Sequence, residues 1–393
     1  MDNFVNLGYK IKEKSATVSI VGLGYVGLPL AFNVVKNGFR AVGYDVDSSK
    51  ITSLEKGEIY ISNVECDGLK GFIENKQFIP TGQTHMLKES DIIIITVPTP
   101  LTKNREPDLR YVVETCEVIA KNLRSGTLIC LESTTYPGTT RDLMKGILEK
   151  SGLLCGSDFF IAYSPEREDP GNKTHTVNTI PKVVGGLGER ATQLAVNFYS
   201  KIVPNVVKVS SCEVAEATKL TENIFRAVNI ALVNELKVVY DKMGIDIWEV
   251  IDAAASKPFG FMKFSPGPGW GGHCIPLDPF YLTWKAREYG VSSKFIELAG
   301  EVNVSMPDWV VKKIQDALNL QKKSISNSNV LLVGISYKKD IEDTRESPAL
   351  VIMKKLEEGG AVVSYHDPYN PFIPLMRDAP EKEGLSSCEL TES

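Results

Sequence analysis

A loop late in the chain carries a cysteine in a setting that suits covalent chemistry. It runs from Pro266 to Phe280 and reads PGPGWGGHCIPLDPF, with Cys274 directly after a Gly-Gly-His run and Asp278 four residues further on. Glycines let a backbone come close to a ligand, and a thiolate is a strong nucleophile. The loop by itself is compatible with a reactive thiol beside a substrate and equally with a packed cysteine in a proline-rich turn.

A second group of polar residues lies in a long segment with helical periodicity. Lys219, Asn223 and Arg226 fall between Ser211 and Met243, a stretch without proline or glycine in which apolar residues recur every three or four positions. The spacing of four puts Lys219 and Asn223 on one helical face. That face is either a solvated polar stripe or a cation and an amide donor directed at a developing oxyanion. The same spacing resembles that of the β-hydroxyacid dehydrogenases, which leaves a single oxidation without a thiol as an alternative function.

A glycine-rich turn near the N-terminus predicts a dinucleotide site. It spans residues 22–27, GLGYVG, and has the pattern G-x-G-x-x-G. The expected cofactor contacts are Gly22, Gly24, Tyr25, Val26 and Gly27. Such glycines permit a tight turn and let a pyrophosphate sit on the N-terminus of the following helix. Asp45 ends the next predicted strand, where an acid binds the adenosine ribose and repels a 2′-phosphate. We therefore expect NAD rather than NADP, with Lys50 either supporting the ribose or lying in solvent.

The composition narrows the class of protein. A chain of 393 residues that is 43% hydrophobic can bury more than one core, and a net charge of −5 with dispersed basic residues argues against nucleic-acid binding. Apolar runs are too short to cross a bilayer, and the N-terminus lacks the apolar stretch of a secretory signal. The 7 cysteines and 4 histidines are scattered. We expect no disulfide framework, no metal site and a reducing, cytoplasmic setting.

The alternation of strands and helices shows how these residues are positioned. Apolar runs predict strands that begin at Thr17, Arg40, Asp91, Thr127, Phe159 and Lys182, and amphipathic stretches predict helices over 28–37 and 48–56. This order is typical of a parallel, doubly wound α/β sheet. Ligands bind at the carboxyl ends of such strands, where Ser133, Thr134 and Glu166 fall.

Three domains follow from this organisation. Residues 1–208 form a predicted NAD-binding Rossmann-like domain, and residues 209–320 a helical central domain with the cysteine loop. A helix of about 30 residues is about 45 Å long, which suits a bridge between domains or a dimer interface. Residues 321–393 form a third predicted unit with a strand, a helix over 348–358 and a second strand, the start of a Rossmann-like pattern. Two strands and a helix make a poor independent core, so this unit either docks tightly on its neighbours or is cut short.

Eight motifs in one order resemble the UDP-glucose/GDP-mannose dehydrogenase family across nearly the whole chain. They are GLGYVGLPLA, the acid at Asp45, VPTP, ESTTYPGTT, YSPEREDPG, EATKLTENIFRAVNIALVNEL, GPGWGGHCIPLDPFYLTWKA and ISYKKDIEDTRESPA. The cysteine loop is most similar to that of members acting on UDP-N-acetylated hexosamines, above all UDP-N-acetylglucosamine. Pro170 stands where UDP-glucose members carry a second glutamate, which supports the same substrate class. Other UDP-sugars (UDP-ManNAc, UDP-GalNAc or UDP-glucose) stay open as alternatives.

The resemblance implies a four-electron oxidation of the sugar 6-hydroxyl to a carboxylate with two NAD+. Cys274 would form a thiohemiacetal and then a thioester, Lys219 would stabilise the oxyanion, Asn223 would act through an ordered water, and Asp278 would be the neighbouring base. Thr134 and Glu166 would hold water and assist proton transfer or thioester hydrolysis. The long helix would form the core of a homodimer.

The resemblance also implies two sets of binding residues. The cofactor set comprises the glycine-rich turn together with Asp45, Lys50, Pro98, Thr99, Ser133, Thr134 and Arg345. The substrate set comprises Glu166, Arg167, Lys219, Asn223, Arg226, Phe261, Lys263, Gly271, Lys338 and Lys339. Family members continue beyond a segment like GLSSCELTES, so a chain ending at Ser393 is expected to have an incomplete UDP-sugar domain. A shortened, non-catalytic NAD-binding form is therefore a further alternative.

Overall fold

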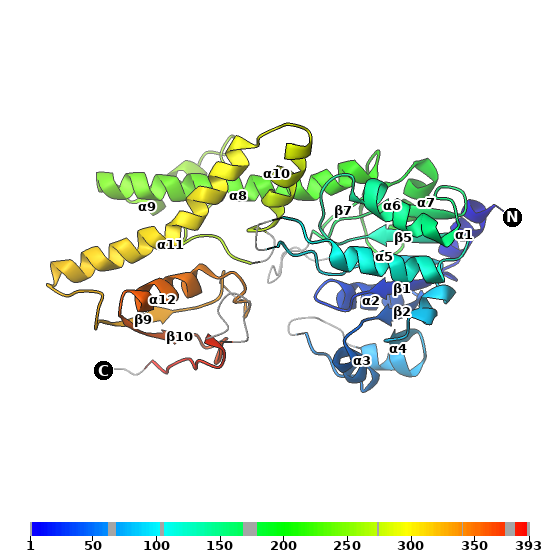
Figure 1. The fold of residues 1–393 in the computed structure, drawn as a ribbon, viewed down its shortest axis with the longest axis horizontal. Coiled ribbons are helices and arrows are strands. Elements are labelled where there is room, and N and C mark those ends of the chain that lie inside the picture. Colours follow the sequence, from blue (N-terminus) through cyan, green and yellow to red (C-terminus); the bar gives the residue numbers. More distant parts are fainter. Residues whose placement is uncertain are drawn as a thin grey trace. The chain divides into compact units, whose positions relative to one another are not determined.

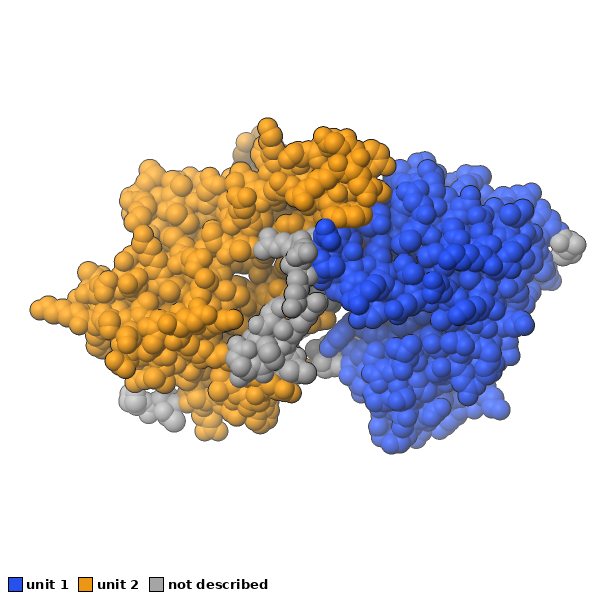
Figure 2. Space-filling model, in the orientation of Figure 1, with its two compact units in different colours: residues 1–221 blue, residues 222–393 orange. Residues whose placement is uncertain are grey.

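The computed structural model describes residues 2–61, 68–102, 106–167, 179–272, 275–339, 341–373 and 382–390. Its internal contacts divide the chain into two units, residues 1–221 and 222–393, which Figure 2 colours blue and orange. The division falls inside the long helix α8 (Cys212–Met243). The predicted domain boundaries at 208 and 320 stay a prediction.

Unit 1 is built on an eight-stranded sheet with the order β3-β2-β1-β4-β5-β6-β7-β8. The strands are β1 (Thr17–Val21), β2 (Arg40–Tyr44), β3 (Phe78–Thr81), β4 (Ile92–Ile95), β5 (Thr127–Leu131), β6 (Phe159–Tyr163), β7 (Lys182–Gly186) and β8 (Val206–Lys208). The first six pair in parallel. Because the order reverses between β1 and β4, the carboxyl ends of these two strands form the switch point where doubly wound sheets bind ligands. The predicted α/β fold is confirmed.

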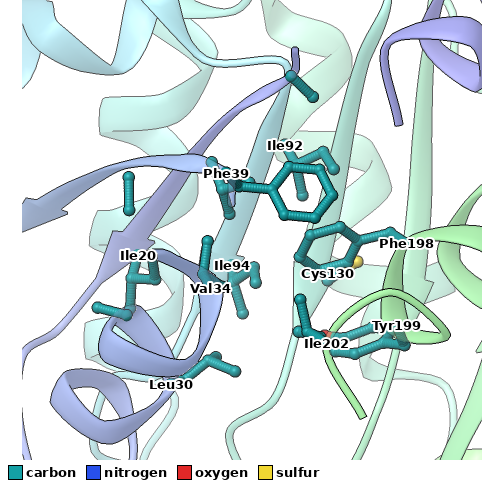
Figure 3. Close-up of a cluster of buried hydrophobic side chains, with 14 of the residues drawn as sticks. Ile20, Leu30, Val34, Phe39, Ile92, Ile94, Cys130, Phe198, Tyr199 and Ile202 are labelled. Carbon is teal, nitrogen blue, oxygen red and sulfur yellow. The ribbon is translucent and has the colours of Figure 1, made fainter. Parts of the chain in front are cut away.

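Helices cover both faces of this sheet (Figure 1). They include α1 (Asn3–Lys12), α2 (Gly27–Lys36), α3 (Ser48–Glu55), α4 (Leu69–Glu74), α5 (Arg110–Asn122), α6 (Lys145–Leu148) and α7 (Glu189–Tyr199). Ile92 and Ile94 belong to a core cluster with residues of α1, α2 and α7, so the equally buried Ile93 and Ile95 face the other side. Figure 3 shows part of this cluster, in which Phe39 packs edge-on against Phe198 at 5.6 Å between ring centroids.

Among the predicted strands, β7 departs from the parallel arrangement that the sequence predicts. β7 pairs antiparallel with β6, in a register that sets Tyr163 opposite Gly185. A parallel neighbour needs a crossover connection, usually a helix, and residues 164–181 contain prolines and no apolar helical period. The reversal brings the first residue of β7, Lys182, to the edge of the sheet at which β6 ends.

The start of α8 is fixed to unit 1 by buried hydrogen bonds. The carboxylate of Glu216 accepts from the backbone N–H of Gly138 at 2.6 Å and of Thr140 at 3.0 Å, and from the Thr140 hydroxyl at 2.9 Å. The hydroxyl of Ser211 accepts from the N–H of Val214 at 3.3 Å and so caps the N-terminus of α8. Residue 216 lies one helical turn before Lys219, so these bonds set the position of that turn.

Unit 2 combines long helices with a small parallel sheet. Its elements are the rest of α8, α9 (Ile247–Ala255), α10 (Asp278–Glu288), α11 (Lys294–Leu320), β9 (Asn329–Val333), α12 (Pro348–Glu358) and β10 (Val362–His366). β9 and β10 pair in parallel beneath α12, and Ile352 and Leu356 pack with Val310 and Ile314 of α11. The strand–helix–strand order and the bounds of α12 confirm the prediction for this region.

Candidate active site

The glycine-rich turn has the geometry of a dinucleotide cradle. Gly22 has φ +95°, and a Cβ there would lie 2.9 Å from the carbonyl oxygen of Thr96. A Cβ on Gly27 would lie 1.8 Å from the carbonyl oxygen of Gly22, so the helix start can pack on the strand only with glycine. A Cβ on Gly24, in contrast, would meet no atom within 4 Å. The first and third glycines thus serve the fold, and the second faces open space, as ligand approach requires.

Asp45 holds this turn in place from the end of β2. Its carboxylate, 6% exposed, accepts from the N–H of Leu23 at 2.7 Å and from the Lys50 ammonium at 3.0 Å. Lys50 is therefore paired with the acid rather than free in solvent. Two positioning contacts escaped the sequence analysis: the Thr96 hydroxyl donates to the carbonyl of Gly22 at 2.7 Å, and the Tyr60 hydroxyl to that of Leu23 at 2.6 Å.

Further predicted residues follow the neighbouring parallel strands at the same edge. Pro98 and Thr99 come after β4, and Ser133 and Thr134 after β5. The Ser133 hydroxyl donates to the carbonyl of Val97 at 2.6 Å, which ties the two strand ends together. The switch-point edge therefore gathers Gly22, Asp45, Thr99 and Thr134, although these residues are up to 112 positions apart in sequence.

Glu166 follows β6 and is held by a cation that the sequence analysis did not identify. Its Oε2 lies 3.2 Å from the Nζ of Lys182, and its Oε1 accepts from the N–H of Arg167 at 2.7 Å. The same ammonium lies 2.7 Å from Oε2 of the buried Glu132. The available signal was a lysine opening a strand that is otherwise wholly apolar.

Three predicted catalytic residues come from the region of α8 and α10. In unit 2 the Asn223 amide donates to the carboxylate of Asp278, and both side chains are buried. Asp278 opens α10, where the helix dipole favours a carboxylate. Lys219 lies one turn before Asn223 on α8 and is 8% exposed, and its ammonium has no ion pair or hydrogen bond with the residues that the structure describes. Such a cation is available to a developing negative charge.

Cys274 lies outside the described residues, but the loop leading to it is closely packed within unit 2. A Cβ on Gly271 would lie 2.4 Å from the Cβ of Tyr337, and the N–H of Gly272 donates to the carbonyl of Arg345 at 3.0 Å. At the other end of the loop, the N–H of Gly267 donates to the side chain of Asn234 at 2.9 Å. Gly271 therefore gives room to a protein neighbour, Tyr337, where the sequence pattern suggests room for a ligand.

Asn234 belongs to a buried amide network that supports this loop. Its Nδ2 donates to Oδ1 of Asn303 at 2.8 Å, and Nδ2 of Asn303 donates to the carbonyl of Ala227 at 3.2 Å. The network joins α8, α11 and the loop, and all of its side-chain groups lie in the interior of unit 2.

The predicted basic and aromatic substrate residues of unit 2 are mostly exposed. Lys263 pairs with Asp252, and Arg345 forms a bidentate ion pair with Asp343, with Nε–Oδ1 at 2.8 Å and Nη2–Oδ2 at 2.5 Å. The others in this set are Arg226, Phe261, Lys338 and Lys339, of which Lys338 is half-buried and the rest exposed. Their assignment to substrate or cofactor stays a prediction.

Two other cysteines of the described chain are poor nucleophiles. Burial raises the pKa of Cys116 to about 12 and, together with Glu149, that of Cys155 to about 11. Among the residues that the structure describes, no group of histidine, cysteine and acidic side chains is arranged to hold a metal ion. Within the same residues, no helix is both long and apolar enough to span a bilayer.

Comparison with known proteins shows which family this chain belongs to. Sequence models of the UDP-glucose/GDP-mannose dehydrogenase family match in order, with the NAD binding domain at residues 16–203, the central domain at 213–305 and the UDP binding domain at 331–392. The chain belongs to the UDP-glucose/GDP-mannose dehydrogenase family. The resemblance seen in the sequence is thereby confirmed, and the chain is an NAD-dependent oxidoreductase of this family.

Individual relatives cover most of the chain. Protein CapL of Staphylococcus aureus is 39% identical over 89% of this chain and 81% of its own length. UDP-N-acetyl-D-glucosamine 6-dehydrogenase of Pseudomonas aeruginosa is 38% identical over 91% of this chain and 83% of its own. The solved UDP-D-ManNAc dehydrogenase of Pyrococcus horikoshii is 34% identical, covers 90% of this chain and 84% of that one, and superposes with a TM-score of 0.85.

The residues of unit 1 fit the cofactor of the family. A cradle in which only Gly24 faces open space, at the start of a helix without a side-chain cap, matches the requirements of a pyrophosphate. Beside the cradle, the buried acid Asp45 is suited to bind a ribose without a 2′-phosphate. The turn and the acid are therefore the part of the chain that would hold NAD.

Proposed function

We propose that this enzyme oxidises the 6-hydroxyl of a UDP-N-acetylhexosamine, with UDP-N-acetylglucosamine as first choice, to the uronate. The observation that carries the proposal is the buried Asn223–Asp278 hydrogen bond within unit 2. On α8 itself, the buried Lys219 lies one helical turn before Asn223. The names of the Pseudomonas and Pyrococcus relatives support an acetamido sugar, and the cysteine loop favours the gluco substrate.

The reaction needs two oxidations at one carbon. NAD+, which the glycine-rich turn and Asp45 would hold, would supply the hydride acceptor for both. In the first, Asp278 takes the hydroxyl proton while Lys219 stabilises the alkoxide, which leaves an aldehyde. The Cys274 thiolate then bonds to the aldehyde carbon, and a second hydride transfer turns this thiohemiacetal into a thioester. Water bonds to the acyl carbon and the C–S bond breaks, which releases the carboxylate and regenerates the thiol.

Glu166 and Thr134 are the proposed positioners of that water. Glu166 follows β6 at the same edge of the sheet as the glycine-rich turn, and it is partly exposed, with 24% of its side chain accessible. A carboxylate at this edge can accept the proton of the attacking water.

A thiol that must stay reduced fits a cytoplasmic enzyme, and a UDP-linked uronate fits the synthesis of surface polysaccharides.

We also propose a homodimer formed through α8. Phe225, Leu232 and Val239 are 48%, 54% and 45% exposed and follow one another at intervals of seven residues. Such spacing places them on one side of the helix, as in helix pairing. Sedimentation of Leu232→Asp should give monomers where the parent chain gives dimers; an unchanged dimer would exclude this face.

Activity with a panel of UDP-sugars tests the function directly. We expect NADH formation with UDP-N-acetylglucosamine above all others and a uronate as the only sugar product. Cys274→Ala should lose uronate formation, while Cys155→Ala, a substitution of a poorly nucleophilic thiol, should keep it. Full uronate production by Cys274→Ala would exclude the covalent mechanism, and NADH formation with UDP-glucose alone would exclude the proposed substrate.

A further inference from the structure

The antiparallel strand β7 delivers a buried cation to the ligand edge of the sheet. In the register that sets Tyr163 opposite Gly185, the amino end of β7 runs alongside the residues that follow β6. Lys182, the first residue of β7, therefore lies beside Glu166 at the carboxyl edge. In a parallel β7 the same lysine would stand at the opposite edge, far from any ligand.

Lys182 is the centre of a nearly closed ionic network. Its side chain is 9% exposed, and its ammonium lies 2.7 Å from Glu132 Oε2 and 3.2 Å from Glu166 Oε2. The second oxygen of Glu132 accepts from the Tyr199 hydroxyl at 2.5 Å. Burial by itself would lower the pKa of Lys182, but the two carboxylates raise it, so the lysine is charged.

The network has one end that reaches solvent. Glu132 and Tyr199 are at most 1% exposed, whereas 24% of the Glu166 side chain is accessible. Taking an ion pair out of water costs several kcal/mol per ion, so apolar residues of the same volume would stabilise this part of the core as well or better. Stability alone therefore does not explain the network. Its accessible end is the Glu166 carboxylate, which in the proposed function positions the hydrolytic water.

We propose that Lys182 is a positioning residue that fixes the Glu166 carboxylate for thioester hydrolysis, with Glu132 and Tyr199 anchoring the lysine from the core. This inference rests on the proposed function. The Glu132 carboxylate orients the ammonium, the ammonium holds Oε2 of Glu166, and the N–H of Arg167 holds Oε1. Both oxygens are then fixed, so the lone pair that takes the proton of the attacking water has a defined direction.

Rapid mixing of Lys182→Met with NAD+ and the UDP-sugar tests the assignment. Hydride transfer precedes hydrolysis, so we expect the first two NADH per active site at nearly the parent rate. Steady turnover should then fall roughly 100-fold, the loss typical of a misplaced reacting group. A sugar–thioester adduct on the intact protein should accumulate in its mass spectrum. Lys182→Arg should restore turnover, since it keeps the charge.

Two further variants make the result decisive. Lys208→Met removes an exposed lysine of the same unit, paired with Glu189 at 2.6 Å, and should behave as the parent. If Lys182→Met does not fold, Lys182→Met with Glu132→Gln removes both buried charges while keeping an acceptor for Tyr199, and should show the same burst and adduct. An equal loss of burst and turnover, or no adduct, would overturn the positioning role. Absence of two NADH or of a uronate in the parent enzyme would instead overturn the proposed function.

Discussion

Gly24→Ala should weaken NAD binding without weakening the fold. A methyl group at this position meets no protein atom within 4 Å, and Gly24 does not require a left-handed backbone. Replacing a glycine at such a position changes stability by about 0.4–1 kcal/mol, usually upward. The methyl would occupy the space that the pyrophosphate approaches and displace one charge-assisted hydrogen bond, worth about 1.5–3 kcal/mol. That corresponds to a dissociation constant for NAD+ raised roughly 10- to 150-fold.

Gly27→Ala is the matched control three residues away. Its Cβ would lie 1.8 Å from the carbonyl oxygen of Gly22 and 2.6 Å from the Thr96 hydroxyl, so the backbone has to move. Such overpacking costs about 1–3 kcal/mol or more, which lowers the melting temperature by several degrees. Titration calorimetry with NAD+ and thermal unfolding of each variant separate the two effects. Unchanged NAD+ affinity in Gly24→Ala, or a loss that only follows a lower melting temperature, would refute the assignment of Gly24 to the ligand.

Three further substitutions test other parts of the structure. Burial raises the pKa of Glu216 to about 7, although the hydrogen bonds that its carboxylate accepts lower it. Because the pKa is higher in the folded than in the unfolded protein, the free energy of unfolding should fall by up to about 3 kcal/mol as the pH rises from 4.5 to 7. Urea unfolding at both pH values should show that slope in the parent and lose it in Glu216→Gln; a slope kept in the variant would contradict the cause. Asp45→Ser should reduce the preference for NAD+ over NADP+ about tenfold in paired KM measurements, since it removes the charge facing the 2′ position, and an unchanged ratio would place Asp45 away from the ribose. Asn234→Leu removes the acceptor of the Gly267 N–H and the donor to Oδ1 of Asn303, and should destabilise unit 2 by about 2–4 kcal/mol in denaturant unfolding. A loss below 1 kcal/mol, about that of a single hydrogen bond, would mean that water replaces the amide.

Local signals in the sequence were enough for most of the elements. The observed bounds of helix α12 match the prediction, because Pro348 marks its start and Gly359 and Gly360 its end. The structure adds a cap, in which the Ser347 side chain accepts from the N–H of Ala349. The β1–turn–α2–β2 unit followed in the same way from buried apolar runs separated by glycines. Helix α1 was not predicted, since its amphipathic pattern is short and lies in a segment considered only as a possible signal peptide.

Local sequence signals do not predict the direction of β7 or the partners of buried polar and charged side chains. Nothing between residues 182 and 186 distinguishes a parallel from an antiparallel strand, and that direction alone decides whether Lys182 meets Glu166. The hydrogen bond of Asn223 to Asp278 joins residues 55 positions apart, and the spacing on α8 predicted only one of the two partners. The glycine at position 271 suggests space for a ligand, because the sequence does not show that Tyr337 fills this space.

The central claim is a double oxidation at one carbon of the sugar, and counting NADH tests it most directly. The purified enzyme, given excess NAD+ and a limiting, weighed amount of UDP-N-acetylglucosamine, should produce NADH until the sugar is exhausted. The covalent mechanism predicts two NADH for each UDP-sugar consumed and one equivalent of uronate. A yield of one NADH, with an aldehyde or ketone as product, would contradict it.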